Sequence, residues 1–177
     1  PTGSILASPE VFNYNATEDA LVLDGLTYTF PVGGATVMVG DNTDISALYT
    51  GACAYRAFTD YAGNCGTGNS VGIGGNGATA AMSYAFDSGF SLAGGVSSEP
   101  TEILTEEGQD GYGLEAAYSA DSWGVAVAYS DIDDLATFWG VNGMYAFDAM
   151  TVSGGVESEN PDNGDTGTGF VAVSYTH

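Results

Sequence analysis

Few residues in this 177-residue chain are able to do acid–base or nucleophilic chemistry. Its one histidine, His177, is the last residue, and no serine or cysteine stands at a spacing that would pair with it. Nucleophilic catalysis needs a nucleophile and a base within hydrogen-bond reach of each other. The glycine-rich stretch at residues 72–77 lacks the lysine and the following helix of a phosphate-binding loop. We therefore expect that the chain is not an enzyme.

Two acidic stretches have the composition of a weak calcium site. One holds Asp131, Asp133 and Asp134, and the other holds Asp162 and Asp165 beside a glycine. Calcium takes several carboxylate and carbonyl oxygens, but neither stretch matches the full calcium-binding loop. A solvated acidic loop is the alternative in both cases. The sequence requires no cofactor, and calcium is the one candidate.

The two cysteines, Cys53 and Cys65, lie in a stretch rich in glycine and asparagine. A lone pair in a non-catalytic loop favours a disulfide formed in an oxidising compartment. Two free buried thiols are the alternative. A zinc site would need more ligands than this loop offers.

The net charge of the chain limits the classes of molecule that it can bind. The chain has one arginine, Arg56, no lysine and 23 acidic residues, for a formal charge of −22. Nothing is available to neutralise phosphates, so a nucleic-acid partner is excluded. The charge favours cations, a high-salt habitat or a larger assembly, with a solvated acidic surface as the alternative. The 11 Tyr and 8 Phe argue against disorder, because disordered segments are poor in aromatics.

Period-2 alternation of large and small residues predicts an all-β, antiparallel up-and-down meander in a single domain, residues 1–177. No helix longer than one turn is expected, and Pro1–Thr17 reads as irregular or as a short edge strand. Roughly nine strands are predicted, near Leu21–Phe30, Ala35–Gly40, Gly77–Phe86, Phe90–Val96, Tyr112–Ser119, Trp123–Ser130, Ala136–Tyr145, Met150–Glu157 and Thr168–Thr176.

The faces of these strands differ in an unusual way. The small faces carry Ser, Thr, Gly and Ala rather than long charged side chains, as in the lumen of a membrane β-barrel. We expect Tyr84, Phe90, Tyr118, Trp123, Val125, Val127, Trp139 and Val152 on one face, toward lipid or a dry interface. Thr79, Ser83, Ser91, Glu115, Ser130 and Ser153 are expected on the other.

The predicted connections alternate in length. Short ones (Pro31–Gly34, Asp87–Gly89, Ala120–Ser122, Ala146–Ala149) alternate with longer ones (Asp41–Asn76, Ser97–Gly111, Asp131–Leu135, Ser158–Gly167). Most acids fall in the longer connections, and aromatics gather near strand ends. Short turns at one end, long loops at the other and aromatic girdles are typical of an outer-membrane β-barrel, or a piece of one. A soluble sandwich is the alternative.

Three stretches carry a resemblance to a known family. Leu21–Gly40 (LVLDGLTYTFPVGGATVMVG) contains a Tyr-x-Phe-Pro-x-Gly pattern at Tyr28, Phe30, Pro31 and Gly33. With Asp87–Val96 and Tyr118–Ser130, which has a Trp-Gly after a short turn, it resembles the hairpins of cyanobacterial outer-membrane porins of the carbohydrate-selective and iron-uptake group. Members of that family are larger and bind the cell wall through an N-terminal domain. The resemblance therefore implies a piece of the barrel only.

A long porin loop that folds inward narrows the pore, and ionised side chains there shape ion passage. Arg56 and Asp60 in the cysteine-bearing loop, with the lumen-facing Glu115, are the candidates for such a constriction. A local ion pair between Arg56 and Asp60, worth little at a surface, is the alternative.

Two functions from different classes follow. One is a passive channel for small solutes or cations in the bacterial outer membrane, with lipid and further copies of the chain as partners. The other is a secreted structural protein of the cell surface that forms filaments by strand addition. A soluble calcium-dependent adhesion sandwich is a third possibility.

Overall fold

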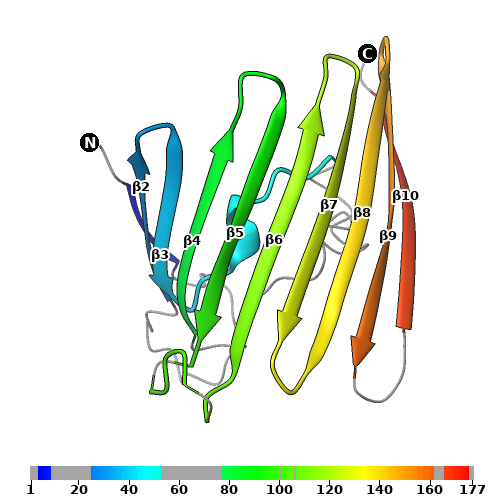
Figure 1. Cartoon of the computed structure of the whole chain (residues 1–177). Coiled ribbons are helices and arrows are strands. Elements are labelled where there is room, and N and C mark those ends of the chain that lie inside the picture. Colours follow the sequence, from blue (N-terminus) through cyan, green and yellow to red (C-terminus); the bar gives the residue numbers. More distant parts are fainter. Residues whose placement is uncertain are drawn as a thin grey trace, which may run out of the picture.

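The computed structural model of the chain describes residues 4–8, 25–52, 77–99, 101–105, 107–161 and 166–175. This part is all-β, as predicted, and forms one antiparallel ten-stranded sheet in sequence order (Figure 1). The strands are β1 (Ser4–Ser8), β2 (Gly25–Val32), β3 (Ala35–Asp41), β4 (Ala78–Ala85), β5 (Phe90–Ser98), β6 (Asp110–Ser119), β7 (Trp123–Ile132), β8 (Ala136–Phe147), β9 (Met150–Pro161) and β10 (Thr166–Tyr175). The described part contains one helical element, the single 3-10 turn η1 (Ile45–Leu48).

All nine predicted strands are present, and β1 adds a tenth. It lies within Pro1–Thr17, the stretch expected to be irregular or an edge strand, and pairs antiparallel with β2 from Ser4↔Thr29 to Ser8↔Gly25. Because the strand number is even and every pairing is antiparallel, the two edge strands β1 and β10 run in opposite directions.

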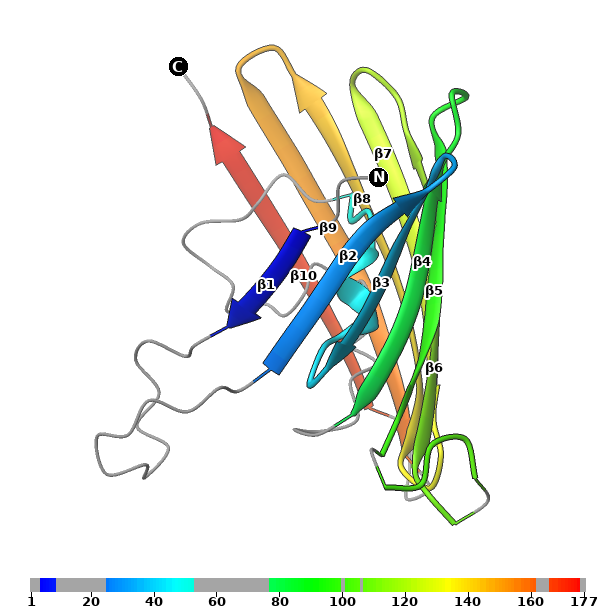
Figure 2. The same cartoon turned by 90° about the vertical axis from the view of Figure 1, so that its left-hand side faces the viewer.

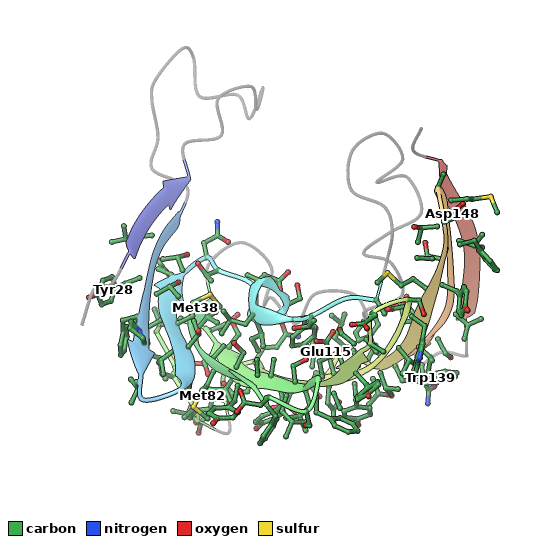
Figure 3. All side chains as sticks on the ribbon, turned by 90° about the horizontal axis from the view of Figure 1, so that it is seen from above. Tyr28, Met38, Met82, Glu115, Trp139 and Asp148 are labelled. Atoms are coloured by element: carbon green, nitrogen blue, oxygen red, sulfur yellow. The ribbon has the colours of Figure 1, made fainter. Side chains whose placement is uncertain are left out.

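The sheet is strongly curved and does not close. Seen along the strands it forms a trough, with β1 and β2 on one wall and β9 and β10 on the other (Figure 3). Each edge strand has one partner in the described part of the chain: β1 pairs with β2, and β10 pairs with β9. Within the described residues the trough is therefore an open curved sheet, with β1 and β10 at its two edges (Figure 2).

The two predicted faces are confirmed. Large apolar side chains stand on the convex side, where Tyr28, Met82 and Trp139 point outward, whereas Glu115 and Met38 point into the trough (Figure 3). Leu114, Phe90 and Val127 are 64%, 54% and 49% exposed. On the concave side Ala117, Ala126 and Ser130 are buried. Most soluble sheets have the reverse arrangement, with their large apolar residues in the core.

Four short connections lie together at one end of the sheet (Figure 1). They join β2 to β3, β4 to β5, β6 to β7 and β8 to β9, and we call this end the turn end; the opposite end is the loop end. The predictions of longer connections at Ser158–Gly167 and at Asp131–Leu135 are both wrong. Strand β9 extends to Pro161 and β10 begins at Thr166, with Gly167 paired to Ser158. Strand pairing continues through Asp131↔Thr137 and Ile132↔Ala136, which leaves a tight turn of residues 133–135.

Candidate functional site: an inner segment on the concave face

The stretch after β3 turns into the trough instead of leaving the sheet (Figure 3). We call residues 42–52 the inner segment. Its first residues are fixed at the loop end, where the Asn42 N–H donates to the Gly77 carbonyl at 3.0 Å. The Thr79 hydroxyl donates to the Thr43 carbonyl at 2.6 Å and lies 2.8 Å from the Ser97 hydroxyl. A hydroxyl hydrogen bond between Thr27 and Thr43 adds a tie to β2.

The middle of the inner segment is the turn η1, which buries an apolar side chain against the sheet. Asp44 precedes the turn, and its carboxylate accepts the Ser46 N–H at 3.0 Å, a typical N-cap. Ile45 is fully buried and packs with residues of β3, β4, β7 and β8. The members of this cluster are Met38, Ile45, Ala81, Ile132, Ala136 and Phe138, with Leu48 and Tyr49 against them.

Two strand side chains hold the far end of the inner segment. The Glu115 carboxylate on β6 accepts the Thr50 N–H. The Asn142 Oδ1 on β8 accepts the Ala52 N–H at 2.8 Å. The Ala52 side chain packs on Ala117 and Ala126, with Met144 beside them. The segment therefore runs from the loop end of β3 to the middle of β8.

Several buried polar atoms of the inner segment and of the concave face beneath it have no hydrogen-bond partner among the described residues. They are the second carboxylate oxygen of Glu115, the Asn142 amide nitrogen, the Ser130 hydroxyl and the Tyr49 hydroxyl. Burial, together with the carboxylates of Glu115 and Asp44, raises the pKa of the Tyr49 phenol, which stays protonated. Buried polar groups usually pair with protein or water. The interface between the inner segment and the concave face therefore contains polar atoms as well as apolar side chains.

The predicted site residues have different outcomes. Glu115 faces the trough as expected and is 4% exposed. Arg56, Asp60, Cys53, Cys65, Asp162 and Asp165 lie outside the described residues, so the constriction partners and the disulfide stay predictions. Asp133 and Asp134 are exposed in the turn after β7, which Asp131 precedes. In the part of the chain that the structure describes, no three acidic, histidine or cysteine side chains are grouped to hold a metal ion.

Sequence reasoning missed Asn142, Thr79 and Ile45 as residues of this site. Asn142 had a usable signal, because it is an amide at an inward position of β8 between Gly140 and Met144. An amide at such a position suggests that something inside the trough needs a hydrogen bond. Ile45 had none, since an isolated apolar residue after Asp44 does not reveal where the chain will turn.

No protein-family model and no curated protein matches this sequence. Among the described residues, none belongs to a helix with the length and apolar character needed to cross a membrane.

Proposed function

We propose that this chain forms part of the wall of an outer-membrane β-barrel channel, through which small solutes or cations diffuse passively. The observation that supports the proposal is that the large apolar side chains are on the outer, convex face of the sheet, whereas a soluble sheet buries them in its core. The convex side exposes large apolar side chains over the middle of β6, β7 and β8, whereas the concave side there carries mostly small side chains with a few polar ones such as Glu115, Ser130 and Asn142. Contiguous exposed apolar surface of this kind is typical of contact with lipid or a partner.

The aromatic residues of the convex face support lipid as the contact. At the turn end Phe90 contacts Tyr118 with ring centroids 4.7 Å apart, and Tyr118 contacts Trp123 at 5.2 Å. Register places Tyr145 beside Trp123, which extends this row across β8. We call the row the turn-end belt; its members are Tyr84, Phe90, Tyr118, Trp123 and Tyr145.

A second row, the loop-end belt, consists of Tyr112, Tyr129 and Trp139. On each of β6, β7 and β8 the two belts are six residues apart (112 and 118, 123 and 129, 139 and 145). At about 3.4 Å per residue the spacing is roughly 20 Å along the strand. In outer-membrane barrels the strands are tilted by about 35–45°, so this spacing corresponds to about 15 Å of height, within the apolar band about 25 Å tall that lies between two aromatic girdles. Between the belts the convex face holds Leu114, Val125 and Val127, all exposed.

On the concave side, the inner segment would narrow such a channel. A segment that lies across the inside of a barrel reduces its open cross-section, as a constriction does. The resemblance of Tyr28, Phe30, Pro31 and Gly33 to the hairpin pattern of cyanobacterial porins points the same way. The free edges of β1 and β10 need further antiparallel strands to complete the wall, and further copies of this chain are one source.

The alternative is a secreted structural protein that assembles by strand addition at the cell surface. The observation that favours it is the pair of free edges, since an unpaired edge is a template for another strand. In such an assembly the convex apolar face would be covered by protein instead of lipid.

Measurements of solubility, vesicle insertion and conductance on the purified assembly distinguish the two proposals. A channel requires detergent to stay in solution, inserts into lipid vesicles and gives stepwise conductance in a planar bilayer. Fibres that form in detergent-free buffer and conduct nothing would overturn the channel and support the filament. A soluble, monodisperse, non-conducting particle would overturn both.

A further inference from the structure

We infer that Glu115 and Asn142 are positioning residues that hold the inner segment across the trough and so set the cross-section of the pore. The pore part rests on the proposed function. The docking part does not, because it concerns two hydrogen bonds within this chain.

These two hydrogen bonds join parts of the chain that are far apart in sequence. Thr50 and Ala52 are two residues apart, but their acceptors lie 65 and 90 positions further along the chain. The acceptors stand on β6 and β8, so the pair spans β7 between them. Two bonds to separate strands fix both the position and the direction of the segment's far end.

The neighbouring side chains of the concave face cannot replace them. Register places Ala128 beside Glu115 and Ala126 beside Asn142, and neither alanine has an acceptor. Glu115 is 4% and Asn142 1% exposed, so water has little access to either bond. A buried donor that loses its acceptor costs more than an exposed one. Ala52 is buried and Thr50 is exposed, so the hydrogen bond from Ala52 to Asn142 stabilises the position of the inner segment more than the one from Thr50 to Glu115.

The first measurement is amide hydrogen exchange of the purified protein in detergent micelles. In Asn142→Ala we expect the Ala52 amide to exchange about tenfold faster or more, because a buried hydrogen bond is lost. Glu115→Ala should speed exchange at Thr50, by a smaller factor. Glu115→Gln keeps an acceptor oxygen and should restore slow exchange.

Ser130→Ala is the matched control. Ser130 is on the same concave face and equally buried, but its hydroxyl has no partner among the described residues. This variant should leave exchange at Thr50 and Ala52 unchanged. Amides in the centre of β7 report whether the sheet itself is intact, and they should keep their protection in every variant.

The second measurement is single-channel conductance together with the size limit for neutral sugars. Asn142→Ala and Glu115→Ala should raise both, whereas Glu115→Gln and Ser130→Ala should raise neither. Unchanged exchange at Thr50 and Ala52 in both alanine variants would overturn the docking. Faster exchange with unchanged conductance would overturn the control of pore size. Faster exchange in a protein that never conducts would overturn the channel and leave the docking supported.

Discussion

Ile45 is the residue at which the inner segment is buried most deeply. It is fully buried in a cluster drawn from four strands, whereas Leu48 and Tyr49 are only partly buried at its margin. The segment therefore stays in the trough through an apolar anchor in addition to its hydrogen bonds.

Ile45→Ala should destabilise the fold by about 2–4 kcal/mol, because it removes buried methyl groups and leaves a cavity. The measurement is the free energy of unfolding in urea, with the protein in detergent micelles. Leu48→Ala is the control and should cost less than half as much, because Leu48 is partly exposed. Equal costs at the two positions would contradict the anchoring role of Ile45.

Two glycines in the short turns differ in what surrounds them. Gly33 (φ +61°) and Gly89 (φ +89°) both have a backbone conformation that L side chains rarely adopt. A Cβ at Gly33 would meet nothing within 4 Å, whereas one at Gly89 would lie 2.5 Å from the Ser119 carbonyl oxygen. The Gly89 carbonyl also accepts the Ser119 N–H at 2.9 Å, which ties the turn to β6.

Gly33→Ala should cost about 1–2 kcal/mol from the positive φ alone. Gly89→Ala should cost more, because β6 must also move away from the turn. Urea unfolding of the two variants side by side is the measurement. A larger loss for Gly33→Ala would argue against the packing of the β4–β5 turn on β6.

A charged substitution on the convex face of a strand can show whether that face contacts lipid or water. Val127 lies on β7 between the two belts and is 49% exposed. A lysine there should cost about 2–4 kcal/mol if the face contacts lipid at the bilayer midplane. On a water-exposed surface the same change would usually stay within about 0.5 kcal/mol.

The measurement is the unfolding free energy of Val127→Lys in lipid vesicles. Leu135→Lys is the matched control, because Leu135 is similarly exposed but lies in the turn after β7, beyond the loop-end belt. It should be nearly neutral. A neutral Val127→Lys would exclude a lipid-facing β7.

For the whole molecule, the charge of −22 makes a cation-selective pore the expectation. In the described connections Glu99, Glu102, Glu107, Asp133 and Asp134 lie at the loop end, and Asp87, Asp121 and Asp148 lie one to each of three turns at the turn end. Both rims are therefore acidic, and the loop end more so. Carboxylates around a pore raise the local cation concentration and repel anions.

Cation preference should be strong in dilute salt and weak in concentrated salt, because the screening length falls from about 30 Å at 0.01 M to about 3 Å at 1 M. The measurement is the reversal potential of the purified assembly across a planar bilayer under a salt gradient. Anion preference in dilute salt would contradict this electrostatic account.

The sequence alone determined nine of the ten strands, their two faces and the turn end of the sheet. These features are local: alternation of side chains along one strand assigns its faces, and glycine or aspartate marks each turn at the turn end. The position of Glu115 on the concave face followed from the same alternation. The tight turn at residues 133–135 was missed because acidic residues suggested a loop where strand pairing continues.

Only the tertiary structure decided where residues 42–52 lie and which side chains hold them. The bonds of Thr50 to Glu115 and of Ala52 to Asn142 join positions 65 and 90 residues apart, and no local pattern encodes such a pairing. The pairing of β1 with β2 likewise depends on the edge that β2 presents. The curvature of the sheet also belongs to this level, because it arises from the twist accumulated over many paired strands and not from any single one.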